Sequence, residues 1–423
     1  MKIRERLPTS IYALILVVLT SLFCIGLLYS KFLLSVVLFL LGPLSLLSID
    51  EKTNHWHFRS DFFNKVNGFL NRPEWWLIMA PFFIVLFGGF YSDESLYWLE
   101  RLRIKFPFLL VPLAFYLIPK VSKSLYNHLH FIFLLVVALS TIPIVWYMIG
   151  HYGEVIEALR HGRPVATPIS HIRYSLFVAF AACISFILTQ RDSFTLLKKS
   201  YLLSLGIYLT LFLHFLAVRS GIVAFYSVAI FFAFRYILHA QRFVPAFILG
   251  FTLLLMPFLA YETIPSFKQR IAYMVEDATK YQKREWNNYS DAERMLSIRA
   301  GLAITAENPL FGTGTGDLPQ EMRQYFYKNY YKDTFIMPHN QFVSILAGSG
   351  ICGLVLFLLA LGWPVYRWYR SDEHNDLFIA LNIIVSVSLM VENTFETSVG
   401  VAFYLFFTLL GLNHMKENEM APS

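Results

Sequence analysis

Residues 11–47 read IYALILVVLTSLFCIGLLYSKFLLSVVLFLLGPLSLL, and Lys31 is the one charged residue among them. An α-helix needs about 20 consecutive apolar residues to cross the hydrocarbon core of a bilayer. This run is long enough for two such helices, with Lys31 and its polar neighbours at the turn between them. The stretch therefore predicts two membrane-spanning helices, 11–29 and 32–48.

The whole chain has the same apolar character. Of its 423 residues, 57% are hydrophobic and 15% are charged, whereas soluble domains carry about 25% charged residues. A globular core of this size cannot hide so much apolar surface from water. The composition excludes a soluble enzyme, a disordered chain and a nucleic-acid-binding protein. It predicts an all-α polytopic membrane protein whose net charge of +7 comes from Lys and Arg gathered in loops on one side of the membrane.

The apolar runs predict about twelve transmembrane helices. Their expected ranges are 11–29, 32–48, 74–91, 106–119, 129–150, 172–189, 201–218, 221–238, 244–262, 340–364, 376–392 and 399–413. The fourth is short and contains Pro107 and Pro112, so a broken or tilted segment is an alternative there. Short loops on one side hold about twofold more Lys and Arg than those on the other. By the positive-inside rule, both termini are expected to be cytoplasmic.

This pattern divides the chain into three parts. Residues 1–262 hold the first nine spans, residues 263–338 form one large outer loop, and residues 339–423 hold the last three spans and a cytoplasmic tail. The outer loop carries ten Lys and Arg residues. We therefore expect it to meet an anionic partner.

The outer loop contains a helix signal. The sequence Ser290-Asp291-Ala292-Glu293 has the form of a capping box, and a helix is expected from there to just before Asn308-Pro309. Its apolar residues recur at helical spacing, which predicts an amphipathic helix on the membrane face; these are Met295, Ile298, Leu302 and Ala306.

A glycine-rich segment follows that helix. Residues 309–317 read PLFGTGTGD, with glycines at 312, 314 and 316. Glycines at alternate positions suit a tight turn, and they also suit a loop whose backbone amides approach an anion. Both interpretations are open from the residues alone.

Two residues at the predicted outer face are candidates for chemistry. His339 opens the tenth span; it is either an interface residue or a group that transfers protons near neutral pH. The small residues Ala347, Gly348, Gly350 and Gly353 follow it and allow close helix packing, which favours the second interpretation. Arg219 lies between two apolar spans; it either snorkels to the interface or faces a cavity or pathway.

Other polar and thiol groups point to no specific chemistry. Arg101, Arg103 and Lys105 are placed on the first outer loop, where they contact lipid phosphates or belong to an amphipathic interfacial helix. Glu392 and Glu396 are expected to be helix-packing or cavity-lining groups and are given no role. The three cysteines lie inside apolar runs, so neither a disulfide framework nor a metal site is expected.

Taken together, these features resemble the O-antigen ligase family (WaaL-type), within the superfamily that also includes the O-antigen polymerases. The family motif His-[Asn/Ser/Gln]-x9-Gly-x2-[Gly/Thr/Tyr] is matched by His339, Asn340, Gly350 and Gly353. The arginine that opens the family's periplasmic helix is matched by Arg294, with Arg299 in the same stretch, and the essential arginine of a middle span is matched by Arg219. One departure is Ile298, where relatives often carry Trp.

The resemblance implies a GT-C-type glycosyltransferase that needs no metal and no cofactor. Such an enzyme moves a glycan from undecaprenyl diphosphate to a hydroxyl of lipid A–core, with inversion, at the periplasmic face of the bacterial inner membrane. Its partners would be that donor, that acceptor and membrane lipids, and loop 263–338 would be periplasmic. His339 would be the catalytic group, and Arg219 and Arg294 would bind the diphosphate. Asn340, Gly350, Gly353 and Arg299 would be motif or supporting residues.

Three alternatives are open. A polymerase and a protein O-oligosaccharyltransferase of the same superfamily need the same handling of the donor. A membrane transporter is a different class, and it would place ionisable residues near the midplane and show repeated halves. The chain shows no internal repeat, and its candidate functional residues lie at one predicted face of the membrane.

Overall fold

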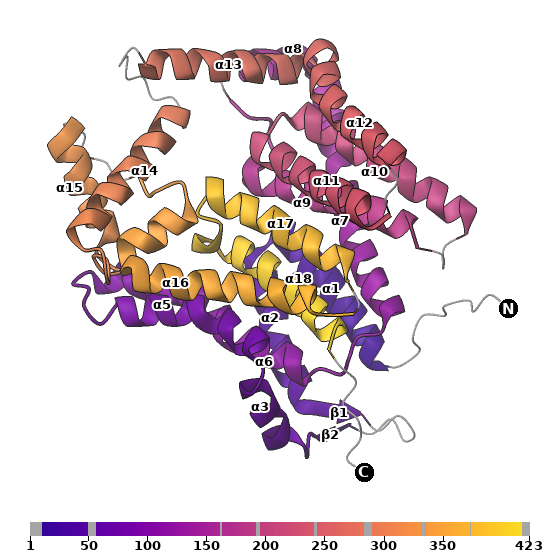
Figure 1. Cartoon of the computed structure of the whole chain (residues 1–423), viewed down its shortest axis with the longest axis vertical. Helices are drawn as coiled ribbons and strands as arrows, with labels where there is room; N and C mark the ends of the chain where they lie inside the picture. The colour runs from indigo at the N-terminus through magenta and orange to yellow at the C-terminus, as the bar shows by residue number, and fades with distance from the viewer. Residues whose placement is uncertain are drawn as a thin grey trace. The chain divides into compact units, whose positions relative to one another are not determined.

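The computed structural model describes residues 11–49, 56–160, 163–191, 195–240, 243–282, 290–330, 333, 336–372 and 374–416. These residues are almost entirely helical (Figure 1). The chain forms two compact units, which are described separately. Unit 1 consists mainly of Asn127–Ala292 with Ile383–Ser388, and unit 2 of Arg6–Tyr126, Glu293–Asn382 and Leu389–Ser423. The ends predicted to be cytoplasmic, 1–10 and 417–423, lie outside the described residues.

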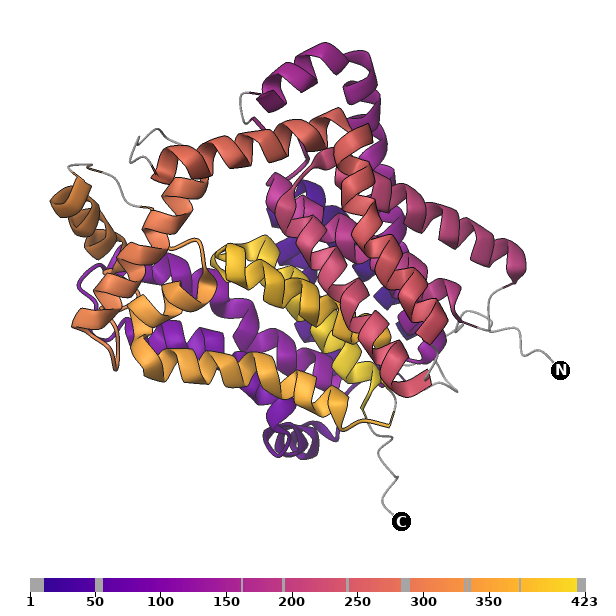
Figure 2. The same ribbon diagram turned by 45° about the horizontal axis from the view of Figure 1, so that its top comes forward.

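Unit 1 is a helical bundle. Its elements are most of α7 (Lys123–Gly150), then α8 (Tyr152–Arg160), α9 (His171–Thr189), α10 (Leu196–Leu216), α11 (Arg219–Ala240), α12 (Phe243–Thr263) and α13 (Pro265–Gln282). Helix α9 packs against both α10 and α11 (Figure 2). Gly221 allows the close approach of α11, because a Cβ there would lie 2.6 Å from the Cβ of Ser175. A buried hydrogen bond of 2.8 Å between Ser140 Oγ and Tyr174 Oη joins α7 to α9.

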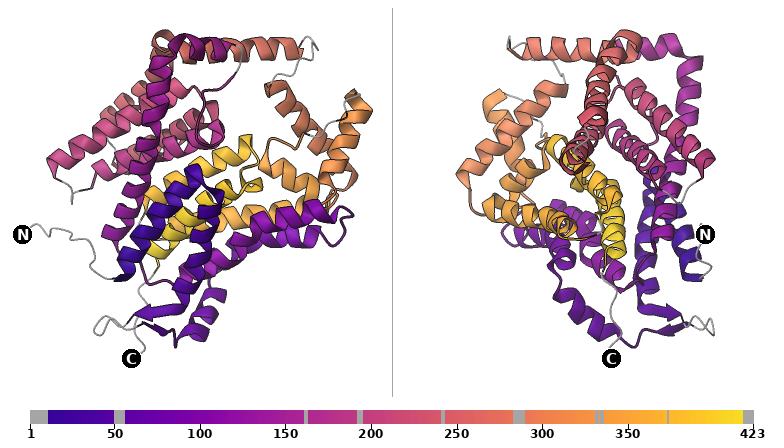
Figure 3. Two further views of the ribbon diagram at one scale, coloured as in Figure 1. Left: turned by 180° about the vertical axis from the view of Figure 1, so that it is seen from behind. Right: turned by 45° about the vertical axis from the view of Figure 1, so that its right-hand side comes forward.

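Unit 2 contains the two ends of the described chain. Its elements are α1 (Ile11–Tyr29), α2 (Lys31–Leu46), β1 (Leu47–Ile49), β2 (Trp56–Phe58), α3 (Phe62–Leu70), α4 (Pro73–Trp76), η1 (Leu77–Met79), α5 (Ala80–Gly88), α6 (Ser95–Leu117), α15 (Leu318–Tyr330), α16 (Gln341–Tyr369), η2 (Thr394–Glu396) and α18 (Ser398–His414). Helices α14 (Ser290–Glu307) and α17 (Asp376–Val391) have residues in both units. The short antiparallel pair β1–β2 (Figure 3), with Leu47 opposite Phe58, is strand structure that the sequence analysis did not predict.

Each of the twelve predicted spans overlaps a helix, although the span 32–48 ends in β1. By length and composition, six of the described helices can cross a membrane: Ile11–Tyr29, Lys123–Gly150, His171–Thr189, Leu196–Leu216, Arg219–Leu238 and Gln341–Tyr369. Four shorter apolar helices accompany them: Lys31–Leu46, Pro73–Gly88, Asp376–Val391 and Ser398–His414. The all-α membrane fold is thus confirmed in its coarse form, while the count of twelve and the GT-C class stay predictions.

The predicted loop around Arg101 is wrong. Helix α6 runs without interruption from Ser95 through Pro107 and Pro112, so the charged residues 101–105 are helical, as the interfacial-helix alternative requires. Lys105, however, is only 3% exposed and does not face solvent or lipid phosphate. The sequence analysis failed here because the carboxylate that pairs with Lys105 is Glu396, 291 residues further along the chain.

The helices of the predicted outer loop have a small core of their own. Leu296, Ala300 and Ile304 form one buried stripe of α14, which packs on α15 and on the first turns of α16 through Leu318, Met322, Phe326 and Ala347. Helix α14 ends at Glu307, as predicted. The predicted apolar face points the other way, with Met295 47% and Leu302 48% exposed; its contact with lipid stays a prediction. The side chain of Ser290 lies outside the described residues, so the capping box is untested.

Helix α16 breaks at Gly350. This residue has φ 65° and ψ −167°, a conformation that is essentially restricted to glycine. In an unbroken helix, the amides of residues 351 and 352 would donate to the carbonyls of residues 347 and 348. Here Ile351 N donates to Pro309 O at 2.9 Å and Cys352 N to Leu310 O at 3.2 Å.

The glycine-rich loop takes up the carbonyls that the break releases. Thr313 N donates to Ala347 O at 3.0 Å and Gly314 N to Gly348 O at 3.1 Å. The backbones approach so closely that a Cβ on Gly350 would overlap the carbonyl of Leu310, and one on Gly312 would overlap the amide of Ser349. The break and the loop are therefore joined by backbone hydrogen bonds, which hold α14 and α15 against α16.

We expect Gly350→Ala to destabilise the protein by at least about 1–3 kcal/mol, because the alanine would be strained and would clash with Leu310. Gly362→Ala is the matched control in the same helix, since no atom lies within 4 Å of its Cβ position; it should be neutral or slightly stabilising. Thermal unfolding of the detergent-purified variants, followed by the loss of monodisperse protein, measures both. Equal midpoints for the two variants would contradict this account of the break.

Candidate functional site

Asn340 caps the helix that His339 precedes. Its backbone is extended (φ −159°, ψ 118°), and its Oδ1 accepts a hydrogen bond from Val343 N at 3.1 Å. Its Nδ2 donates to Met390 O at 3.0 Å, near the end of α17. Asn340 therefore starts α16 and also ties it to the chain segment that leads to Glu392.

His339 is held between two segments of unit 2. Its backbone amide donates to Ser297 Oγ of α14 at 3.1 Å. Its imidazole Nδ1 lies 3.5 Å from Oε1 of Glu392, and its side chain is 32% exposed. The ring is thus oriented by a carboxylate while part of it is open to its surroundings.

Arg294 approaches the same carboxylate. Its Nη2 lies 3.9 Å from Oε1 of Glu392, whose side chain is 16% exposed. At 3.5 and 3.9 Å the contacts are ion-pair distances rather than short hydrogen bonds. The structure therefore brings together two of the three groups expected to do chemistry, His339 and Arg294, around Glu392.

Glu392 is the site residue that the sequence analysis missed. It was expected to be a packing or cavity-lining group without a role. Its position could have revealed it, because an ionisable residue at the end of an apolar span is energetically costly and is commonly functional. Its partners could not be read from the sequence, because they lie 53 and 98 positions before it.

The chemistry available to this arrangement is proton transfer beside a cation. A carboxylate at Nδ1 orients an imidazole and stabilises its protonated form, so that Nε2 is left to accept a proton from an alcohol. A guanidinium is permanently charged and can bind an anion with two parallel hydrogen bonds. An imidazole and a guanidinium thus share one carboxylate at the start of α16.

The glycine-rich loop is not an anion cradle, so that alternative is wrong and the tight-turn interpretation is confirmed. All five backbone amides from Gly312 to Gly316 donate hydrogen bonds to protein acceptors at 2.9–3.3 Å. The acceptors are Ser92 Oγ and four carbonyl oxygens, those of Asn308, Ala347, Gly348 and Gly88. Asp317 in turn accepts from the amides of Asp93 and Glu94. These glycines serve backbone packing.

Arg219 belongs to unit 1. It is the first residue of α11, and it follows Ala217, which has a left-handed backbone with φ 51°. This sharp break places Arg219, half-buried, at a helix N-terminus. Both a guanidinium and the positive end of a helix dipole favour an anion.

The remaining supporting residues have distinct places. Arg299 is exposed on α14, five positions beyond Arg294 and so turned about 140° around the helix from it. A Cβ on Gly353 would overlap the side chain of Ser349 and would lie 3.5 Å from Cγ2 of Ile84 on α5. Within the described ranges, no three His, Cys, Asp or Glu side chains form a group that could hold a metal ion.

Replacing Asn340 with Ala should lower stability by about 1–2 kcal/mol, because α16 loses its cap and its bond to Met390. Asn340→Ser keeps an oxygen for the cap and should lose less. Thermal unfolding separates the two, with Thr195→Ala, which removes the cap of α10, as the reference for a cap alone. Equal losses for Ser and Ala would show that the cap contributes nothing.

One segment of the chain resembles a known protein family. Residues 203–358 match the model of a protein family described as O-antigen ligase (Wzy_C). No curated protein matches the chain. The matched segment includes Arg219, Arg294, His339 and the glycine break, and it ends before Glu392. Residues 203–358 of the chain are therefore similar to the O-antigen ligase family.

Proposed function

We propose that this protein is a glycosyltransferase of the ligase type, which transfers a glycan from undecaprenyl diphosphate to a hydroxyl of lipid A–core. The observation that carries the proposal is the meeting of His339 and Arg294 at Glu392. A base beside a fixed cation is the pair that such a transfer needs. The similarity of residues 203–358 to the O-antigen ligase family supports a glycosyltransferase-like activity in lipopolysaccharide synthesis.

The reaction needs a proton acceptor and a stabilised leaving group. His339 Nε2 takes the proton of the acceptor hydroxyl as its oxygen attacks the anomeric carbon. The bond from that carbon to the diphosphate oxygen breaks, and the diphosphate leaves with the electron pair. Attack from the face opposite the leaving group inverts the anomeric configuration. Glu392 keeps the imidazole oriented and stabilises it once it is protonated.

The two arginines serve the leaving group. Charge on the diphosphate grows as the bond breaks, and a guanidinium placed in advance stabilises that charge without reorganising. Arg294 lies beside the base, and Arg219 lies at a helix N-terminus, where amides add to the positive field. No metal ion is required in this scheme.

The cellular setting belongs to the same proposal. The protein would be a multi-pass protein of the bacterial inner membrane with about twelve spans, GT-C architecture and both termini in the cytoplasm. Residues 263–338, which include α13, α14 and α15, would form the periplasmic loop. The six helices long enough to cross a membrane support the membrane location.

The decisive experiment measures transfer of glycan from purified undecaprenyl-diphosphate-linked donor to lipid A–core by the detergent-purified protein in excess EDTA. His339→Ala should lower the rate by about 100-fold or more, since it removes the general base. His151→Ala, at an exposed histidine of unit 1, is the control. A folded His339→Ala variant with full activity would overturn the proposal, and activity that is lost in EDTA and restored by Mg²⁺ would overturn its metal-free form.

Arg219→Lys and Arg294→Lys should each lower transfer by at least about 10-fold, although both keep the positive charge. Lysine cannot bind two oxygens in the geometry of a guanidinium. Arg323→Lys is the matched control, because Arg323 is 57% exposed on α15 and pairs with Asp333 at 3.6 Å. Full activity of both test variants would exclude diphosphate binding by these arginines.

The lipopolysaccharide profile of a deletion strain tests the acceptor. Loss of the whole glycan ladder with free core retained is the expected result. Core that carries a single repeat would indicate a polymerase instead, and an unchanged lipid profile with underglycosylated protein would indicate a protein O-oligosaccharyltransferase.

A further inference from the structure

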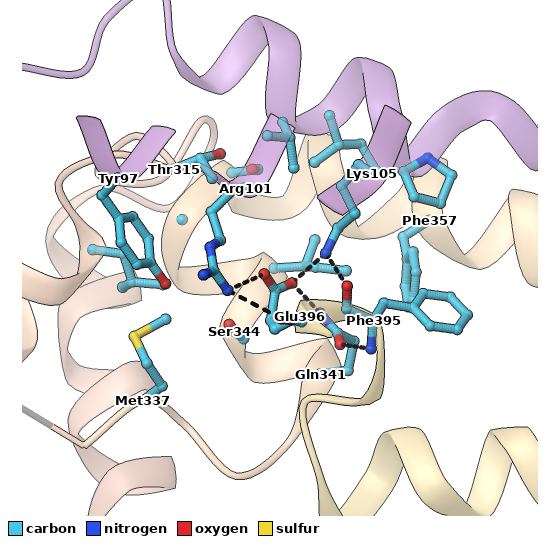
Figure 4. A pocket seen from close by; sticks show the side chains of 17 residues that line it. Tyr97, Arg101, Lys105, Thr315, Met337, Gln341, Ser344, Phe357, Phe395 and Glu396 are labelled. Carbon is cyan, nitrogen blue, oxygen red and sulfur yellow. Dashed lines mark hydrogen bonds and ion pairs between the residues drawn. The ribbon is translucent and has the colours of Figure 1, made fainter. Parts of the chain in front are cut away.

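A second charged cluster lies in unit 2, on the chain segment that follows Glu392. It consists of Arg101 and Lys105 from α6, Glu396 from η2, and Gln341, the first residue of α16 (Figure 4). Gln341 is fully buried and Lys105 nearly so. None of these residues has a part in the proposed transfer.

The cations of α6 bind η2 through both its backbone and its side chain. Lys105 Nζ donates to Glu396 Oε1 at 2.7 Å and to the carbonyl of Phe395. Arg101 Nη1 donates to the carbonyl of Glu396 at 3.2 Å and lies 3.5 Å from its Oε2. Two successive residues of η2 are therefore fastened to α6.

Gln341 fastens the same two residues to α16. Its Nε2 donates to Glu396 Oε1 at 3.0 Å, and its Oε1 accepts from Phe395 N at 2.9 Å. Gln341 is two residues after His339, and Glu396 is four residues after Glu392. The cluster therefore sets the distance between the two segments that carry the base and its carboxylate.

The space around the cluster is too small for a substrate. The cavity lined by Arg101, Lys105 and Glu396 has a volume of about 40 Å³, which is room for a few water molecules. Burying three charges is expensive, and well-packed apolar residues are often as stable. A role in placing neighbouring groups accounts for the cluster better than stability or ligand binding does.

The charges around Glu396 favour its carboxylate form. Its burial alone would raise the pKa of its carboxyl group, but Lys105, Arg101 and the hydrogen bond from Gln341 hold that pKa below its usual range. The attraction within the cluster weakens as the pH falls through this lowered pKa.

We infer that Glu396 is a positioning residue, which holds η2 against α6 and α16 so that Glu392 stays beside His339 and Arg294. The inference rests on the proposed transfer reaction. It assigns a role in catalysis to residues of α6 and η2, which lie outside the segment matched by the family.

A double-mutant cycle on the transfer assay tests the inference. Glu392→Gln should lower kcat per folded molecule by about 10-fold or more. Glu396→Gln should lower kcat by about 10-fold in the wild-type protein but by less than about 2-fold when Glu392 is already Gln, because residues that act through one another are not additive. Gln341→Met, which breaks both bonds to η2 without unbalancing a charge, provides the same cycle if Glu396→Gln does not fold.

Glu74→Gln is the matched control. Glu74 is buried and pairs with Arg367 of α16 at 3.5 Å, at the other end of that helix. It should alter the unfolding midpoint but leave kcat per folded molecule unchanged in both backgrounds. Equal losses from Glu396→Gln with and without Glu392, or an unchanged kcat, would overturn the inference. Full activity of His339→Ala would instead overturn the proposed function, so the two failures are distinguishable.

Discussion

The exchange of backbone hydrogen bonds at Gly350 is the constraint on which the site depends. A helix that breaks inside an apolar environment leaves amides and carbonyls that no water satisfies, so the break must be paired elsewhere. The loop 309–316 supplies that pairing: its carbonyls accept from the released amides, and its amides donate to the released carbonyls. Because this loop connects α14 to α15, the same bonds place Arg294 and Ser297 over the start of α16. The geometry around His339 is thus a consequence of one glycine that adopts a conformation closed to other residues.

Two glutamates organise the charges of unit 2. Glu392 faces His339 and Arg294, and Glu396 faces Lys105 and Arg101. An unpaired charge in such a setting costs several kcal/mol, and each carboxylate offsets that cost for the cations around it. The first group is partly open to its surroundings and suits a reaction. The second group is buried around a cavity of about 40 Å³ and suits a role in positioning the first. Their separation by only four residues links the support to the chemistry.

The motif His339-Asn340-x9-Gly350-x2-Gly353 could be found from the sequence, but the reason for each position could not. Asn340 was recognised by resemblance, and the structure shows it as the cap of α16 and a tie to Met390. The glycine-rich loop was seen as a turn or an anion site, and only the partners of its amides decided for the turn. Arg101 and Lys105 were placed on a loop because two prolines and three charges interrupt the apolar run. The helix continues there because its charges are paired with a residue from the far end of the chain.

Local patterns along the chain are enough to show an all-α membrane protein, the positions of its apolar helices, and the family that its middle segment resembles. Those properties depend on local composition and spacing, which a single pass along the chain records. Tertiary structure alone decided that Glu392 joins His339 to Arg294 and that Glu396 is fastened to α6 and α16. These contacts join residues from 53 to 295 positions apart. Electrostatic pairing depends on distance in space, and no local pattern of residues encodes it.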